Sequence, residues 1–292
     1  MPYIKTRDGT DLYVKDWGSG RPVVLIHGWP LSADSWDAQA LALAEAGYRA
    51  IAYDRRGFGR SGQPWTGYDY DTLADDLADV LDQTKARDAT IVGFSMGGGE
   101  VARYMSRHGG KGVVSAGLVS SVVPYMLQTD DNPNGVPEEA LQGIADGIKK
   151  DRFVFWTSFF QDFFGVGFIS SPVSDETLHW AWNVTMQAGL RPILECANAF
   201  GHTDFRGDLP AFKVPTLIVQ GTADKTVPID ATGREAAKGI TGSQLIEYDG
   251  APHGLTVTES DRFTADLLAF LGESGDRKLF QGNDNLIGVD DV

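Results

Sequence analysis

Continuous apolar runs are the feature that most constrains the fold of this chain. "PVVLIHG" (22–28), "YRAIAYDRRG" (48–57) and "ATIVGF" (89–94) begin with β-branched or other apolar residues and lack the polar and apolar alternation of half-exposed strands. Such runs are typical of strands covered on both faces, as in a parallel sheet. Further runs of this kind are "GVVSAGLVSS" (112–121), "VPTLIVQG" (214–221) and "SQLIEYDG" (243–250). We therefore expect a mostly parallel central sheet.

Helical patterns lie between these runs. "SWDAQALALAEAG" has apolar residues at helical spacing and stops at Gly47, which suits a C-cap. "DTLADDLADVLDQTK" predicts a helix with Asp71 as N-cap and with one apolar face. The opening "YIKTRDGTDLYVKDWG" predicts a hairpin that turns at Asp8-Gly9, a dipeptide that accepts positive φ angles. Alternating strands and helices indicate an α/β fold with helices on both faces of the sheet.

The pattern is interrupted once. Residues 124–210 contain no comparable strand run but hold three tryptophans and the phenylalanine-rich "FVFWTSFFQDFFGVGF". We interpret this segment as a helical cap inserted into a core made of residues 1–123 and 211–272. Residues 273–292 are rich in Gly, Asp and Asn, so they are predicted to form a loose C-terminal tail.

Charge and cysteine content exclude several classes of protein. Asp plus Glu outnumber Lys plus Arg by 40 to 25, a net charge of −15, which repels nucleic acid and anionic membranes. The N-terminus lacks the apolar core of a signal peptide, and no run is long enough to span a membrane. A single cysteine, Cys196, forms no internal disulfide, which suits a reducing compartment. We expect a cytoplasmic protein that binds neither nucleic acid nor membrane.

One serine sits at a junction of strand and helix. "TIVGFSMGGGEVARY" (90–104) runs from a strand through Gly93-Phe94-Ser95-Met96-Gly97 into a helical pattern. A strand that enters a helix through one residue forces a sharp turn, which only small neighbours tolerate, and the turn exposes the hydroxyl at the carboxyl edge of the sheet. Ser95 is therefore predicted to be a nucleophile on a G-x-S-x-G elbow.

A serine nucleophile needs a base and an acid that orients the base. His253, in "YDGAPHGL", follows the last predicted strand, and Asp224, in "IVQGTADKTVP", follows the strand before it. Both positions fit the Ser, Asp, His order of this kind of fold. His27, at the end of "LIHG", is the rival base, but we assign it to ordering the loop. The oxyanion donors are expected to be the backbone N–H groups of Met96 and Trp29.

These segments together resemble one branch of the α/β-hydrolase esterases, the cofactor-free haloperoxidases or perhydrolases. The resemblance covers residues 1 to about 272 and is carried by "HGWPLSADSWD", "YDRRGFGRS", "GFSMGGGEVARY", "GTADKTVP" and "APHGL". It implies the same nucleophile, acid, base and oxyanion donors, and no metal or other cofactor. It also implies an oligomer, commonly a trimer or a dimer of trimers, although the extension beyond residue 272 departs from the family pattern.

The resemblance implies hydrolysis of small carboxylic esters, with hydrogen peroxide as an alternative acyl acceptor that yields a peracid. Members with "HGWP" are associated with stronger peracid formation, so Pro30 is of interest. We expect a small aromatic pocket formed by Trp29, Pro30, Phe160, Phe164 and Phe200. A small lactam or lactone hydrolase and a ligand receptor on the same scaffold stay open as alternatives, whereas a dehalogenase would need aspartate in place of Ser95.

Overall fold

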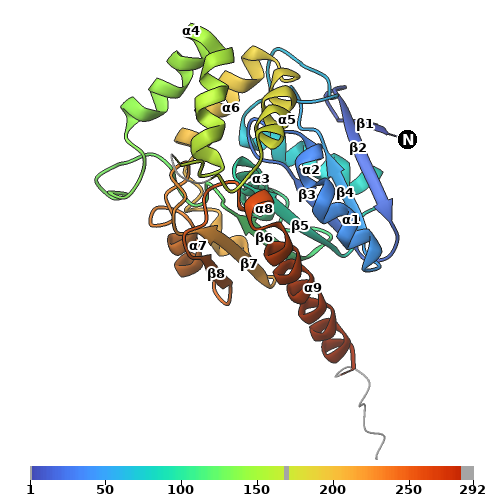
Figure 1. Ribbon diagram of the computed structural model, residues 1–292. Helices are drawn as coiled ribbons and strands as arrows, with labels where there is room; N and C mark the ends of the chain where they lie inside the picture. The colour runs from blue at the N-terminus through green and yellow to red at the C-terminus, as the bar shows by residue number, and fades with distance from the viewer. Residues whose placement is uncertain (1, 168–170, 284–292) are drawn as a thin grey trace, which may run out of the picture.

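The computed structural model describes residues 2–167 and 171–283, and its centre is a twisted sheet (Figure 1). The strand order is β1-β2-β4-β3-β5-β6-β7-β8. β1 pairs with β2 and β2 with β4 in antiparallel fashion, and all other pairs are parallel, as predicted. The strands are β1 (Tyr3–Lys5), β2 (Asp11–Gly18), β3 (Pro22–Ile26), β4 (Arg49–Tyr53), β5 (Ala89–Phe94), β6 (Val113–Val119), β7 (Thr216–Gly221) and β8 (Gln244–Tyr248).

The β1–β2 hairpin turns where the sequence predicts. The amide of Gly9 donates to the Thr6 carbonyl at 2.8 Å, and the amide of Thr6 donates to the Thr10 carbonyl at 2.9 Å. Gly9 has a φ of +91°, but Asp8 is not in the left-handed region, so one residue of the dipeptide supplies the turn rather than two. The carboxylate of Asp8 instead accepts hydrogen bonds from the Thr6 hydroxyl and the Thr10 amide.

Helices cover both faces of the sheet. α1 packs with α9 on one face, and α2 packs with α3 on the other (Figure 1). The central strands β3, β5 and β7 are buried along their whole length, mostly with Val, Ile and Leu, which explains why their sequences do not alternate. The core helices are α1 (Asp37–Glu45), α2 (Tyr70–Gln83), α3 (Met96–Arg107), α7 (Gly233–Gly239), α8 (Leu255–Thr258) and α9 (Ser260–Asn283), and the short 3₁₀ turns are η1 (Ala33–Trp36) and η2 (Leu209–Ala211).

Helix α2 begins earlier than the sequence indicates. Its N-cap is Asp69, which has an extended backbone and accepts a hydrogen bond from the Thr72 amide at 2.9 Å. The assignment of Asp71 as the cap was wrong, because Asp71 lies inside the first turn, where its carboxylate pairs with Arg103. The buried ring of Tyr70 brings the first turn of α2 against the core and so extends the helix toward its N-terminus.

Helix α9 extends into the segment that was predicted to be a loose tail. It continues past Gly272 to Asn283 and runs away from the sheet (Figure 1). Gly272 does not adopt a positive φ, so it does not act as a C-cap, and the Ser274 hydroxyl donates to the Phe270 carbonyl at 2.8 Å within the helix. Residues 273–283 are thus helical rather than loose, and the remainder of the predicted tail, 284–292, lies outside the described residues.

The three longest helices between residues 124 and 210 form one group at the carboxyl end of the parallel strands (Figure 1). They are α4 (Glu138–Phe163), α5 (Asp175–Met186) and α6 (Leu190–His202), and the described part of this segment holds isolated β-bridges but no strand. α4 bends at Asp151, whose carboxylate accepts bonds from the amides of Phe153 and Val154, as an N-cap would. In the described ranges, no helix is both long enough and apolar enough to cross a membrane.

Candidate active site

Ser95 lies at the sharp turn between β5 and α3. Its backbone has a φ of +54° and a ψ of −119°, a conformation that is strained for a residue with a side chain. The flanking glycines make the turn possible, because a Cβ at Gly93 would lie 2.3 Å from the Gly97 carbonyl oxygen and a Cβ at Gly97 would lie 2.5 Å from the Ile26 carbonyl oxygen. The strand, the helix and the neighbouring β3 therefore meet at distances that only glycine allows.

His253 and Asp224 meet Ser95 from two other loops. The Nε2 atom of His253 lies 2.9 Å from the Ser95 Oγ, and its Nδ1 lies 2.7 Å from Oδ2 of Asp224. Asp224 follows β7 and His253 follows β8, so parallel strands deliver both side chains to the same edge as Ser95. The carboxylate fixes the tautomer: Nδ1–H donates to Asp224, which leaves Nε2 free to accept the proton of the serine hydroxyl.

The carboxylate of Asp224 is itself held by backbone amides. Its Oδ1 accepts hydrogen bonds from Thr226 at 2.9 Å and from Val227 at 2.8 Å. Both amides belong to the turn after β7, so this turn aims the other carboxylate oxygen at His253. Ser95 and His253 expose 5% and 1% of their surface, and water therefore weakens this chain of hydrogen bonds little.

The predicted oxyanion donors lie on the two segments that flank Ser95. Met96 is the first residue of α3, and the amides of a first helical turn have no acceptor inside the helix. Trp29 follows β3 in a loop that passes directly beside the serine, because a Cβ at Gly28 would lie 3.0 Å from the Ser95 Cβ and 2.6 Å from the Phe94 ring. Both amides are thus on segments that touch the nucleophile, where a carbonyl oxygen under attack would need them.

His27 does not reach this group of side chains. Its Nδ1 lies 2.9 Å from the Gly28 carbonyl, and its Nε2 accepts a hydrogen bond from the Arg55 amide at 2.9 Å. Complete burial, and secondarily the neighbouring Arg55 cation, hold the pKa of His27 well below its usual value, so the ring is neutral. Both ring nitrogens are engaged with backbone groups, which agrees with a role in ordering the loop.

Aromatic rings form the cap side of the site. Of the predicted pocket residues, Phe200 contacts the Trp29 ring, with centroids 5.2 Å apart. Phe160 and Phe164 stack on each other with their centroids 6.0 Å apart. Both rings are buried, and both contact Phe163, whose own ring lies 4.9 Å from the His253 ring.

Three further rings beside Trp29 and His253 were not predicted from the sequence. Phe163 packs edge-on against His253, and the rings of Phe159 and Trp156 lie 5.5 Å and 5.1 Å from the Trp29 ring. The signal was present in the sequence: Phe159 and Phe163 are four residues apart, so on a helix they share one face. Without the direction of that face, the sequence could not show which phenylalanines point toward Ser95.

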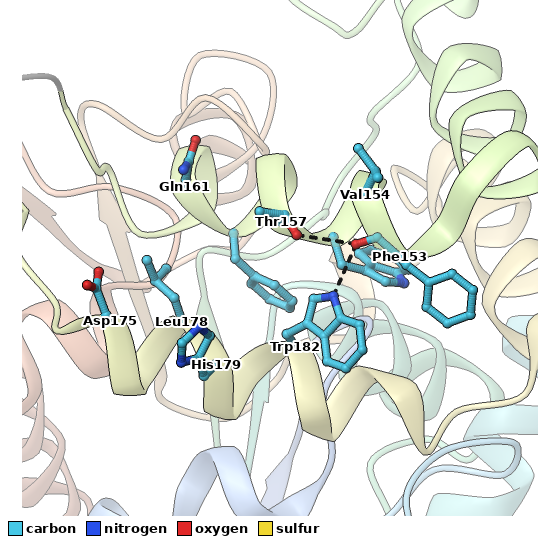
Figure 2. Close-up of a pocket in the computed structure, with 10 residues that line it drawn as sticks. Phe153, Val154, Thr157, Gln161, Asp175, Leu178, His179 and Trp182 are labelled. Atoms are coloured by element: carbon cyan, nitrogen blue, oxygen red, sulfur yellow. Dashed lines mark hydrogen bonds between the residues drawn. The ribbon is translucent and has the colours of Figure 1, made fainter.

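A separate cavity of about 560 Å³ opens between α4 and α5 (Figure 2). Figure 2 shows α4, with Phe153, Thr157 and Gln161, alongside α5, with Leu178, His179 and Trp182, and the Trp182 indole N–H donates to the Phe153 carbonyl. Ser95, His253 and Asp224 do not line this cavity, and the side chains that do include Phe153, which is 58% exposed. Trp156 and Phe160 form the wall that it shares with the aromatic layer over Trp29 and His253.

Other reactive side chains lie apart from the site. Burial raises the pKa of Cys196 to about 12, so its thiol is protonated and a poor nucleophile. Across residues 2–167 and 171–283, no three His, Cys, Asp or Glu side chains are grouped so that they could hold a metal ion.

Comparisons with known proteins agree with this geometry. A family model described as alpha/beta hydrolase fold matches residues 21–259. The chain is 46% identical to the non-heme chloroperoxidase CPO-A1 of Kitasatospora aureofaciens over 94% of this chain and 100% of that protein. It is 40% identical to the bifunctional esterase/perhydrolase DCH of Acinetobacter calcoaceticus over 93% of this chain and 99% of that protein.

A solved structure extends the comparison to three dimensions. The bromoperoxidase of Bacillus anthracis superimposes with a TM-score of 0.89 at 42% sequence identity, covering 92% of this chain and 99% of the other. The range matched by the family model contains Ser95, Asp224 and His253. The chain therefore belongs to the α/β-hydrolase fold family, in the branch that contains the non-heme haloperoxidases.

Proposed function

We propose that this protein hydrolyses small carboxylic esters through an acyl-enzyme on Ser95. The observation that carries the proposal is the continuous hydrogen-bonded chain from the Ser95 hydroxyl through His253 to Asp224. A serine hydroxyl alone is a weak nucleophile at neutral pH, and an oriented imidazole removes its proton as it attacks. The esterase/perhydrolase relative and the haloperoxidase relatives support the same chemistry.

The steps follow from the positions of the groups. Ser95 Oγ attacks the ester carbonyl while His253 Nε2 takes the proton, and the negative charge on the carbonyl oxygen is met by the Met96 and Trp29 amides. The imidazolium then gives its proton to the departing alcohol oxygen. Water, deprotonated by the same imidazole, attacks the acyl carbon and releases the carboxylic acid and free Ser95.

Hydrogen peroxide is the proposed second acyl acceptor. When peroxide replaces water in the last step, the product is a peracid, which oxidises halide in solution and needs no haem or metal for that reaction. Pro30 fixes the backbone beside Trp29, and we assign it the task of presenting the Trp29 carbonyl as an acceptor for the peroxide O–H. Pro30→Leu should then lower the ratio of peracid to carboxylic acid, and an unchanged ratio would remove Pro30 from this role.

One panel of assays tests the proposed function. Acetyl and longer acyl esters, small lactones and small lactams are incubated with the protein, with and without hydrogen peroxide, and Ser95→Ala is the control. We expect steady turnover of small esters and peracid formation only when peroxide is present. If the protein opened a lactam or lactone selectively and did not turn over esters, its function would be lactam or lactone hydrolysis instead. One slow stoichiometric release of p-nitrophenol would instead indicate a ligand receptor on a hydrolase scaffold.

Assembly and location stay predictions. A homo-oligomer, as a trimer or a dimer of trimers, is tested by light scattering of the purified chain at several concentrations. A cytoplasmic location is tested by cell fractionation.

A further inference from the structure

Arg55 is a buried cation that joins two segments of the active site. Its side chain is 1% exposed and lies behind the loop that carries Trp29. The guanidinium Nε donates to the carboxylate of Glu100 on α3, and Nη2 donates to the carbonyl oxygen of His27 at 2.6 Å. One planar group is therefore bonded to a helix and to a loop that are far apart in the sequence.

These two segments are the ones that carry the proposed oxyanion donors. His27 precedes Trp29 by two residues, so its carbonyl lies at the base of the Trp29 loop. Glu100 follows Met96 by four residues, about one helical turn, on the helix that begins with the Met96 amide. Arg55 is thus bonded to both segments that carry these amides, in addition to the pairing of β3 with β5.

Further hydrogen bonds make this connection rigid. The Arg55 amide donates to His27 Nε2 at 2.9 Å, so both the backbone and the side chain of Arg55 hold the same residue. The hydroxyl of Tyr53 donates to the second carboxylate oxygen of Glu100 at 2.7 Å. Each oxygen of this buried carboxylate therefore has a donor, and the imidazole of His27 is fixed in one tautomer.

We propose that the Arg55–Glu100 pair is a positioning device that sets the Trp29 and Met96 amides at the spacing required by the oxyanion. The inference rests on the proposed acyl-enzyme function. The free-energy cost of removing two ions from water offsets most of the attraction between them. A fully buried ion pair therefore need not stabilise the fold, and its presence calls for another role. Oxyanion donors, in contrast, act only when they are held within about 0.5 Å of the productive geometry.

The chain contains a matched pair that lacks this connection. Arg56, the next residue, is equally buried and donates to both carboxylate oxygens of Asp76 at 2.6 Å. Asp76 lies on α2, and the other partner of Arg56 is Asp8 in the β1–β2 turn. The hydrogen bonds of the Arg56 guanidinium thus lead to α2 and to the β1–β2 turn rather than to His27 or α3. Disrupting the Arg56–Asp76 pair should lower the free energy of unfolding without moving the Trp29 and Met96 amides.

The test compares Glu100→Gln with Asp76→Asn. Each change keeps the shape of the side chain and removes one buried charge. We measure kcat and KM for p-nitrophenyl acetate, the rate of inactivation by a p-nitrophenyl phosphonate, which forms a tetrahedral adduct on serine, and the urea midpoint. Both variants should unfold at lower urea concentration than the wild type. Only Glu100→Gln should lower kcat and the phosphonate rate, by about 10- to 100-fold, since complete loss of one oxyanion donor costs about 100- to 1,000-fold.

The pattern of effects decides the outcome. For Glu100→Gln, KM should stay within about twofold of the wild-type value, because the lost interaction is made in the transition state. Equal losses of kcat in Glu100→Gln and Asp76→Asn would overturn the inference, since they would reflect general destabilisation. An unchanged kcat in Glu100→Gln would overturn it as well.

A milder variant covers the case in which Glu100→Gln does not fold. Tyr53→Phe removes one hydrogen bond from the carboxylate and keeps the ion pair, so we expect a several-fold loss of kcat with KM unchanged, and full activity would overturn the inference. Wild type and Ser95→Ala are assayed alongside. Absence of Ser95-dependent turnover in the wild type would contradict the proposed function, whereas normal turnover in all charge variants would contradict the positioning role.

Discussion

The two sides of the active site are built from different interactions. On the core side, Ser95, His253 and Asp224 are linked by hydrogen bonds of 2.7–2.9 Å and held by loops that follow parallel strands. On the cap side, Phe159 and Phe163 contact Trp29 and His253 through ring edges at centroid distances of 5.5 Å and 4.9 Å. Hydrogen bonds depend strongly on direction, whereas ring packing depends mainly on shape. The core side therefore suits chemistry, and the cap side suits the selection of substrates.

This contrast predicts its largest effects at the core side. Ser95→Ala and His253→Ala should each lower kcat for p-nitrophenyl acetate on the order of 10⁶-fold, as removal of the nucleophile or base does in related mechanisms. Circular dichroism and urea unfolding should show a folded chain in both cases. Wild-type activity in Ser95→Ala would show that Ser95 is not the nucleophile. A small loss of kcat in His253→Ala, together with a large loss when His27 is replaced, would show that His27 is the base.

Asp224→Asn should have the next largest effect. The side chain of asparagine can still accept the Thr226 and Val227 amides through its oxygen, but its NH₂ group faces Nδ1 and favours the tautomer in which Nε2 carries the proton. That tautomer cannot accept the Ser95 proton, so kcat should fall on the order of 10⁴-fold. Steady-state kinetics measure this loss, and a change below tenfold would show that the carboxylate does not orient the base.

On the cap side, Phe163→Leu should change substrate preference more than rate. The contact between the Phe163 and His253 rings is worth about 0.5–1.5 kcal/mol, which corresponds to about 2- to 10-fold in kcat/KM. The smaller side chain leaves space for longer acyl groups, so the ratio of butyrate to acetate hydrolysis should rise. Phe153→Leu, on the exposed face of α4, is the control and should leave that ratio unchanged. If Phe163→Leu lowered kcat as much as Asp224→Asn does, the cap side would contribute to the chemical step as much as the core side, contrary to our expectation.

The smallest predicted effect concerns stability and pH. Buried His27 has a lowered pKa in the folded state, and an unfolded histidine titrates near 6.5. The unfolded chain therefore binds more protons below about pH 6.5, so the free energy of unfolding falls as pH drops through that value. Between pH 7.5 and 5.5 this residue should lower the free energy of unfolding by an amount on the order of 1 kcal/mol. Urea unfolding of His27→Gln should show a pH dependence that is smaller by this amount, and an unchanged slope would contradict the assignment.

Much of the core side could be predicted from the sequence because its geometry follows from local rules. The glycines around Ser95 indicate the sharp turn. Asp224 and His253 each follow an apolar run that forms a parallel strand. Parallel strands place their carboxyl ends at one edge, so residues distant in the sequence meet there. The network that joins Arg55 to Glu100 could not be predicted, since nothing in "DRRG" distinguishes Arg55 from Arg56 or names the carboxylate that each one binds.

The cap was harder to predict in detail. The absence of strand runs and the density of aromatic residues indicated a helical cap. Which rings face Trp29, however, depends on the bend of α4 at Asp151. No local sequence pattern specifies that bend. The start of α2 and the end of α9 shifted for similar reasons: the burial of Tyr70 extends one helix, and Gly272 lacks the positive φ that would end the other.

A covalent acyl-enzyme on the Ser95 hydroxyl can be detected by mass spectrometry during turnover. The protein is mixed with p-nitrophenyl acetate, quenched with acid during steady turnover and digested. We expect one acetyl group on the peptide that contains Ser95, and none on the corresponding peptide of the Ser95→Ala variant. Continued ester turnover with no acyl group on that serine, or with the acetyl group on another side chain, would contradict it.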